Sequence, residues 1–173
     1  LDICVQTGVR ALSAYSHQSG ANNTLNASSP DEPTGLNNLG SQAFDASIEL
    51  FGTPSNHYAL ARTTSKSDLD TYLKKKQQAD AAMSHYVTAE SSYIGLMLGS
   101  VVEIKSAIKI LSNTFIEEGI GTYFITEMTH YANGDENSYH SHFVGVSSSV
   151  KTLPTPNVPL PIAQPQMATV ISN

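Results

Sequence analysis

Residues 121–165 constrain the fold most, because only a β-hairpin followed by an extended segment suits them. The run Gly121-Thr-Tyr-Phe-Ile-Thr-Glu-Met-Thr-His130 is rich in β-branched and aromatic residues, and a polar loop separates it from a similar run, Tyr139-His-Ser-His-Phe143. Prolines follow at positions 154, 156, 159, 161 and 165. Proline lacks a backbone N–H and fixes φ, so we expect a stiff linker over residues 151–165 rather than a central strand.

Both ends of the chain predict a longer natural protein. Residues 166–173 begin as Gln-Met-Ala-Thr-Val, which we interpret as the first strand of a further β-domain. The other end begins at Leu1 without Met, and its first residues already alternate like a strand. The sequence has no apolar run near the roughly 20 residues that span a bilayer and no secretory leader. We therefore expect a soluble piece of a larger polypeptide.

The charge balance argues against nucleic acid as a partner. With 15 acidic and 9 basic residues the net charge is -6, and the basic cluster Lys74-Lys75-Lys76 is interpreted as the solvated face of a helix. Charged residues make up only 14% of the chain, which favours a surface covered by neighbouring molecules. Cys4 is the only cysteine, so the chain has neither a disulfide framework nor a Cys-rich zinc module.

One helix is expected, over residues 67–86. Ser65 or Ser67 can cap its start, because each has an aspartate three residues later. No Gly or Pro interrupts the residues that follow, and apolar side chains recur at spacings of three and four, which predicts one face against the body of the protein. These side chains are Leu69, Tyr72, Leu73, Ala79, Met83 and Tyr86.

The other elements are expected to be strands and loops, which makes the predicted fold class α+β and mainly β. Residues 3–15 suit either a strand pair about Gln6-Thr-Gly8 or one irregular strand. Residues 20–40 are rich in Asn, Ser, Pro and Gly and predict a long exposed loop, before a short apolar run over residues 43–51. Further strands are predicted over residues 87–90, 94–98, 101–110 and the hairpin 123–146, with turns or bulges at Gly95, Gly99, Gly119 and Gly121.

Three histidines of the hairpin form the one cluster in the sequence that could carry chemistry. A symmetric hairpin with Tyr131 opposite Tyr139 would place His130 opposite His140 and on the same face as His142, with cross-strand Cβ atoms roughly 5 Å apart. A slip of one residue would instead send His130 to the other face. Structural or interfacial histidines are the alternative that we favour, and no partners are visible for His17, His57 or His85.

The sequence lacks the other common signatures of catalysis. It contains no Gly-x-Ser-x-Gly elbow, Walker loop, Gly-x-Gly-x-x-Gly or His-Glu-x-x-His motif. Glu117 and Glu118 are adjacent, and adjacent residues on a strand point to opposite faces, so we interpret them as a solvated turn rather than paired catalytic carboxylates. We therefore expect no enzyme, no cofactor and no bound metal.

The order of the hairpin motifs resembles the VgrG spike proteins of type VI secretion, also called Rhs element Vgr proteins. In that family an aromatic-rich strand ending in His precedes a Tyr-x-Asn-x-Phe strand, a Pro-rich stretch and a Gln-Thr-Ala-x-Val strand. This chain has Gly121-x-Tyr-x-Ile-Thr, His130, Tyr139-x-x-x-Phe143, prolines and Gln166-x-Ala-x-Val170 in the same order. Upstream, Leu96-Met-Leu-Gly99-Ser-Val-Val-Glu-Ile104 resembles the family's step from leucine, proline and glycine into a hydrophobic strand.

The resemblance is closest over residues 60–173 and loose over the first 60. Ser141 stands in place of the family's Asn, Met167 in place of its Thr, and the chain has no tryptophan. The late control gene D proteins, which form the baseplate hub of contractile phage tails, share the same architecture and are an alternative relative. A partner- or carbohydrate-binding β-module and a His-liganded metal enzyme are the competing interpretations from other classes.

The resemblance implies a hub of small β-barrel-like units of the phage baseplate type, in which three chains close a ring. It assigns residues 1–60 loosely to the hub, 61–150 to a hub β-domain with the helix and the hairpin, 151–165 to the linker, and 166–173 to the next, OB-like barrel. The implied role is structural, because the trimeric membrane-puncturing spike joins a hexameric tube protein to the needle and can carry effector and tip proteins. The family acts from the bacterial cytoplasm and is injected into the target cell. A permanent ring would bury above roughly 2,000 Å² per interface.

Overall fold

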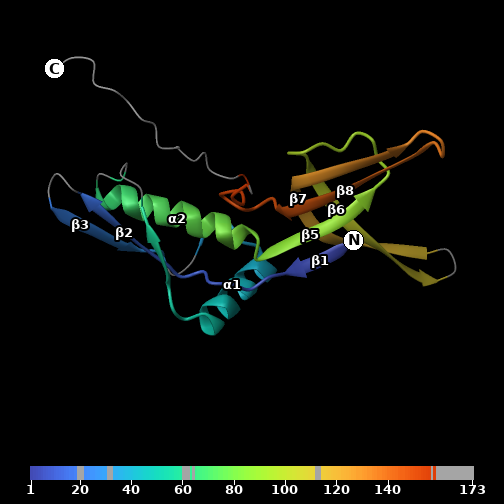
Figure 1. The fold of residues 1–173 in the computed structure, drawn as a ribbon. Helices are drawn as coiled ribbons and strands as arrows, with labels where there is room; N and C mark the ends of the chain where they lie inside the picture. The colour runs from blue at the N-terminus through green and yellow to red at the C-terminus, as the bar shows by residue number, and fades with distance from the viewer. Residues whose placement is uncertain are drawn as a thin grey trace, which may run out of the picture.

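The computed structural model describes residues 1–18, 22–30, 33–59, 63, 65–111, 114–156 and 158 (Figure 1). Its elements form two sheets and two helices, which confirms the α+β, mainly β class but with one helix more than the sequence predicted. In chain order they are β1 (Asp2–Val5), β2 (Leu12–Gln18), β3 (Asn23–Ser28), α1 (Asn38–Leu50), β4 (Ser55–Tyr58), α2 (Lys66–Ala82), β5 (His85–Ser91), β6 (Val101–Leu111), β7 (Thr114–Asn133) and β8 (Ser138–Ser147).

The larger sheet is antiparallel, has the strand order β1-β5-β8-β7-β6, and curls into a half-barrel. The predicted hairpin is confirmed as β7 and β8, and the predicted strands over residues 87–90 and 101–110 are confirmed as β5 and β6. Ile104 pairs with Gly121 while Lys105 pairs with Gly119, so Ile120 is the extra residue of a bulge. Gly121 has a φ of 150°, which L side chains rarely adopt, and this explains glycine at the bulge.

The smaller sheet has the order β3-β2-β4, and α2 covers one of its faces (Figure 1). Alternate residues of β2 point toward α2, so Leu12 and Ala14 are buried there while Tyr15 is exposed. The core between helix and sheet is aliphatic and is formed by Leu12, Ala14, Ala27, Ala59, Leu69 and Leu73.

Helix α2 begins as the sequence predicted and ends earlier. The Ser65 side chain accepts a hydrogen bond from the Asp68 N–H at 3.2 Å, and the Asp68 carboxylate accepts one from the Ser65 N–H at 3.0 Å, which completes a capping box. The predicted end at Tyr86 is wrong, because the chain turns after Ala82 and Tyr86 belongs to β5. The predicted apolar stripe is also partly wrong, since Tyr72 is exposed while two glutamines are buried.

Helix α1 was missed because its residues resemble a loop. Residues 20–40 were predicted to be one long loop, yet they contain β3 and the start of α1. Asn37 caps α1 by accepting a hydrogen bond from the Gly40 N–H at 2.9 Å, and Phe44 is almost completely buried. The buried residues of this helix are Gly40, Ala43, Phe44 and Ser47, and the glycine and the serine weaken the apolar pattern of this face. In Figure 1, α1 lies where the two sheets meet.

Two other segments correct the sequence expectations. Residues 94–98 were predicted to be a strand but form turns in the connection between β5 and β6. Residues 3–15 do not form a strand pair: β1 pairs with β5 in the larger sheet, whereas β2 pairs with β3 and β4 in the smaller one.

The chain after β8 folds back onto α2. Thr152 donates a hydrogen bond from its hydroxyl to the Gln78 side-chain carbonyl at 2.9 Å, and the Ser149 hydroxyl donates one to the Gly35 carbonyl at 2.9 Å. Pro154 and Pro156 then line a groove along α2. The remainder of the predicted linker, except Val158, and the strand predicted over residues 166–173 lie outside the described residues. The boundaries at residues 60 and 150 stay predictions.

Candidate functional site

The three histidines of the hairpin do not converge. In the observed register Tyr131 pairs with His140, His130 with Ser141, and Thr129 with His142. The predicted pairing of His130 with His140 is therefore wrong by one residue, and His130 lies on the opposite face of the hairpin from His140 and His142. Among the described residues, no group of three or more His, Cys, Asp or Glu side chains could hold a metal ion.

Each of the two hairpin faces instead carries an aromatic pair. His130 Nδ1 lies 2.7 Å from the Tyr139 hydroxyl, with ring centroids 6.0 Å apart. On the other face the Tyr131 and His140 rings stack at 4.8 Å with planes 16° apart. Both pairs hold the two strands together close to the hairpin tip, so these histidines have structural roles in the observed geometry.

His85 is the buried histidine of the chain, with 3% of its surface exposed. Its Nδ1 lies 2.7 Å from the Asn37 amide nitrogen and 3.1 Å from the amide oxygen, and its ring meets Tyr123 edge to face at 5.8 Å. The Asn37 oxygen already accepts from Gly40, which fixes the amide so that its nitrogen donates to His85. Burial lowers the pKa of His85 and favours this neutral, accepting form. No sequence pattern links residues 48 positions apart, so this pair could not be predicted.

The adjacent glutamates lie in β7 rather than in a turn, which corrects that interpretation. Glu117 pairs with Ala107 and Glu118 with Ser106 in the ladder to β6, so the two carboxylates point to opposite faces as expected for a strand. Glu117 also lies 3.9 Å from Lys105 Nζ, and both glutamates are exposed. This arrangement cannot place two carboxylates on one substrate.

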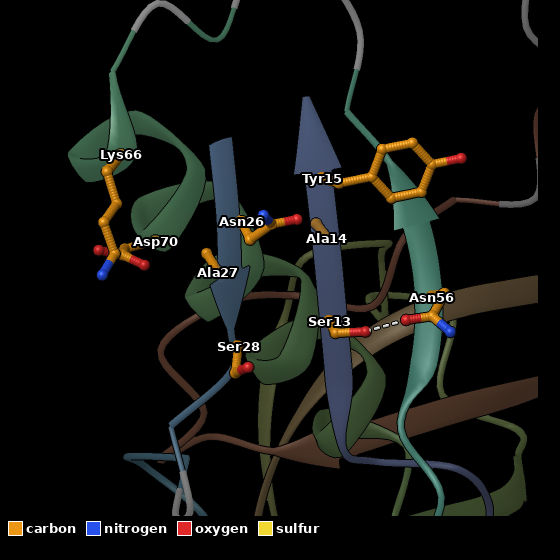
Figure 2. Close-up of a pocket in the computed structure, with 9 residues that line it drawn as sticks. All are labelled: Ser13, Ala14, Tyr15, Asn26, Ala27, Ser28, Asn56, Lys66 and Asp70. Atoms are coloured by element: carbon orange, nitrogen blue, oxygen red, sulfur yellow. Dashed lines mark hydrogen bonds between the residues drawn. The ribbon is translucent and has the colours of Figure 1, made fainter. Parts of the chain in front are cut away.

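The face of the smaller sheet opposite α2 is open and polar. A shallow groove of about 460 Å³ runs over this sheet and the start of α2 (Figure 2). Ser13 and Asn56 are joined by a hydrogen bond there, and Tyr15 packs against Tyr58 with ring centroids 5.3 Å apart. The nine lining residues are Ser13, Ala14, Tyr15, Asn26, Ala27, Ser28, Asn56, Lys66 and Asp70, so the groove offers no histidine or thiol for acid–base or nucleophilic chemistry.

The most unusual surface of the molecule is the connection between β5 and β6, residues 92–100. We call residues 92–101, which include Val101 at the start of β6, the apolar connection. Five of its large apolar side chains are between 59% and 75% exposed, and they are Tyr93, Ile94, Met97, Leu98 and Val101. Monomeric proteins rarely expose several adjacent large apolar residues without a binding role.

The apolar connection is held in place by the sheet beneath it. The Gly99 N–H donates to the Ile125 carbonyl at 3.0 Å, and the Ile125 N–H donates to the Ser100 carbonyl at 2.9 Å. Gly99 adopts a φ of 86°, which favours glycine. Leu98 then borders a groove of about 800 Å³ whose other walls include Phe124 and Pro154. Sequence analysis predicted a strand over residues 94–98 and noted Leu96 to Gly99 through a family resemblance, but it did not predict the exposure of these side chains, which composition does not reveal.

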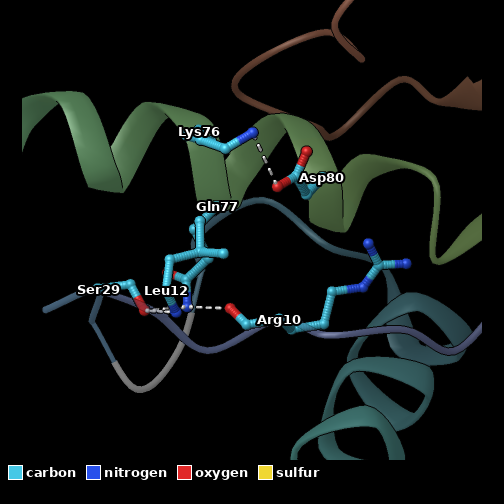
Figure 3. A network of polar contacts seen from close by, with 6 residues as sticks. All are labelled: Arg10, Leu12, Ser29, Lys76, Gln77 and Asp80. Atoms are coloured by element: carbon cyan, nitrogen blue, oxygen red, sulfur yellow. Dashed lines mark hydrogen bonds and ion pairs between the residues drawn. The ribbon is translucent and has the colours of Figure 1, made fainter. Parts of the chain in front are cut away.

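A polar network anchors α2 on the other side (Figure 3). Gln77 is 1% exposed, and its amide nitrogen lies 3.2 Å from the Arg10 carbonyl, 3.1 Å from the Ser29 hydroxyl and 2.7 Å from the Pro30 carbonyl. This network ties two segments to α2: the chain just before β2, through Arg10, and the chain just after β3, through Ser29 and Pro30. Sequence analysis did not identify Gln77 as buried, because a buried glutamine breaks the apolar pattern.

Comparisons with known proteins give no independent identity for the chain. No protein-family model matches its sequence, and no curated protein matches it. Among the described residues, neither helix is long and apolar enough to cross a membrane. We therefore infer a function from the geometry of the chain and from its sequence resemblance.

Proposed function

We propose that this chain is a structural component of a multi-chain assembly, the hub of a spike of the VgrG type in a type VI secretion system. The sequence resemblance supplies the family, and the apolar connection is the observation that supports assembly. A hub of this kind is a homotrimer that joins a hexameric tube protein to the needle, with effector and tip proteins as further partners. The baseplate hub of a contractile phage tail is the alternative machine with the same architecture.

The exposed apolar side chains support assembly with further copies of the chain. Five large apolar residues of the apolar connection lie within nine positions of one another and are mostly exposed. Covering them removes apolar surface from water, which contributes roughly 25 cal/mol for each Å² buried. In the proposed ring a neighbouring copy covers this surface.

The edges of the larger sheet offer a second contact. Within the described residues β1 pairs only with β5 and β6 pairs only with β7, so each leaves one edge with free backbone groups. Ile3 and Val5 of β1, and Leu1 just before it, are also about half exposed. Such edges pair readily with another chain, and in the proposed hub neighbouring protomers cover them.

The proposed mechanism is mechanical rather than catalytic. The ring carries load between the tube and the needle when the surrounding sheath contracts, so its interface residues carry the function. The assembly forms in the bacterial cytoplasm and is injected into the target cell, and it has no nucleic-acid partner.

Light scattering after size exclusion tests the proposal on the natural gene product. A mass of three chains is expected, and Ile94→Asp with Met97→Asp should shift it toward one chain because two charges would be buried at the interface. Tyr58→Asp, on the open face of the smaller sheet, is the matched control and should leave the trimer intact. A single-chain mass at all concentrations of the unaltered protein would overturn the proposal.

A partner- or carbohydrate-binding module is the second candidate, and the groove of Figure 2 favours it. Tyr15 and Tyr58 present exposed rings beside amide and hydroxyl groups, a combination that suits the apolar faces and hydroxyls of a sugar. Binding of an oligosaccharide that Tyr58→Ala abolishes, in a protein that stays single-chain, would support this candidate over the spike.

A further inference from the structure

Arg10 has a largely buried side chain whose guanidinium has no bonding partner within the part of the chain that the structure describes. It lies between β1 and β2, and 8% of its surface is exposed. Its backbone carbonyl accepts the hydrogen bond from Gln77, which fixes its position under α2. Within the described part of the chain the guanidinium forms no hydrogen bond, and its Nε is completely buried (Figure 3).

The guanidinium of Arg10 has N–H donors that need hydrogen-bond acceptors. A guanidinium has five N–H donors and stays charged in proteins. Burial lowers the pKa of Arg10, and the nearby charge of Asp80 raises it. The Asp80 carboxylate nevertheless forms no ion pair with Arg10, and it pairs instead with Lys76 at 3.6 Å, one helical turn earlier. Among the described residues the two Nη groups of Arg10 therefore have no acceptor, and they reach the surface whereas Nε does not.

A cavity lies beside Arg10. Its volume is about 260 Å³, and its walls come from three parts of the chain: Gln6 and Arg10 before β2, Asp80 and Met83 at the end of α2, and Pro154 and Thr155 after β8. Apart from Asp80, Arg10 is the only charged residue of the lining. The cavity therefore combines one unbonded cation with space for a small group.

We propose that this cavity is a binding site for a carboxylate, which accepts two hydrogen bonds from the fork formed by the two Nη groups of Arg10. The planar carboxylate matches the planar guanidinium, and such paired bonds are the strongest that arginine makes. The single negative charge matters, because Asp80 at the wall repels a doubly charged phosphate or sulfate more strongly than a carboxylate. The carboxylate comes from a free small acid or from an acidic side chain of another protein molecule.

Thermal unfolding of the chain with sodium acetate tests the proposal, with sodium chloride at equal ionic strength as the reference. Saturating acetate should raise the Tm by a few degrees beyond chloride, since a ligand that binds only the folded state stabilises it. The shift should disappear in Arg10→Gln and weaken in Arg10→Lys, which keeps the charge but loses the fork. An equal effect of both salts, or an acetate shift that persists in Arg10→Gln, would overturn the site.

A second variant keeps the test decisive if Arg10→Gln does not fold. Asp80→Asn removes the repulsive charge and should tighten acetate binding several-fold, whereas sulfate should gain more than acetate does. If Arg10 instead pairs with Asp80 in solution, Asp80→Asn will lower the Tm and leave acetate binding unchanged, and the proposal fails. The source of the carboxylate follows from comparing acetate with a blocked Gly-Glu-Gly peptide, because tighter binding of the peptide identifies a protein side chain.

Discussion

Tyr131 and His140 lie directly opposite each other on β7 and β8, and their rings stack with centroids 4.8 Å apart. Their pairing fixes the register of the whole hairpin tip. Four residues, 134–137, connect Asn133 to its partner Ser138, and Asn137 takes the positive φ of 47° that the turn needs. A connection one residue longer or shorter would have moved His130 to the face of His140.

Paired cysteines can measure this register. In a Cys4→Ser background, Tyr131→Cys with His140→Cys should form a disulfide on mild oxidation, because directly opposed residues have Cα atoms about 4.5–5.5 Å apart and a disulfide accepts about 4.4–6.8 Å. His130→Cys with His140→Cys should stay reduced, since the two side chains point to opposite faces. Mass spectrometry of the oxidised proteins distinguishes the pairs, and a disulfide only in the second pair would contradict the register.

The sequence predicted this hairpin but not its register. β-branched and aromatic residues on both sides of a polar loop specify two strands whatever their exact alignment. The face on which His130 lies depends on the number of residues in the turn and on the bulge near Thr126, and neither is visible in the periodicity. The metal site considered from the sequence required Tyr131 to pair with Tyr139, and the observed register differs from that pairing by one residue.

The core under α2 should tolerate truncation poorly. Leu69 is fully buried between α2 and the smaller sheet, so Leu69→Ala leaves a cavity and is expected to lower the free energy of unfolding by about 2–5 kcal/mol. Leu39→Ala in α1 is the matched control, because Leu39 is 43% exposed, and it should change stability by less than about 1 kcal/mol. Urea unfolding followed by circular dichroism gives both values. Equal losses in the two variants would show that α2 is not packed on this sheet.

The buried Gln77 side chain should contribute to the free energy of unfolding through its hydrogen bonds. Gln77→Met keeps the length of the side chain but leaves the Arg10 and Pro30 carbonyls without their donor, so we expect a loss of about 1–3 kcal/mol in the free energy of unfolding. Gln42→Met is the control, because Gln42 is exposed on α1 and bonds only to Asn38, one turn earlier. A neutral Gln77→Met, measured by the same urea unfolding, would show that water replaces the network.

Two features that the sequence missed are stabilised in part by partners far along the chain. Ser47 of α1 accepts a hydrogen bond from the Gly8 N–H, and the buried Gln77 side chain donates to the Arg10 carbonyl, and no local spacing predicts either contact. The capping box of α2 is local, so Ser65 and Asp68 could be identified from spacing alone. The apolar connection could be predicted only in part. Its residues stand out in the sequence, but their exposure depends on how the larger sheet positions them.

His85 should make stability depend on pH. Burial lowers the pKa of the folded-state imidazole below the value of about 6.5 expected in the unfolded chain. Between these two pKa values the unfolded chain binds a proton that the folded protein does not, so the contribution of neutral His85 is full above about pH 6.5 and is lost as the pH falls toward the folded pKa. The hydrogen bond from Asn37 to Nδ1 requires the same neutral form.

His85→Gln should therefore flatten the decline in stability between about pH 7.5 and pH 5.5, although it lowers stability at the upper pH by removing the contacts to Asn37 and Tyr123. The matched control is His17→Gln, because His17 is exposed and near the end of β2. Urea midpoints across this range are the measurement, and the slope of the control should follow that of the unaltered protein. An unchanged slope in His85→Gln would mean that the buried imidazole accepts its proton as readily in the folded state as in the unfolded chain.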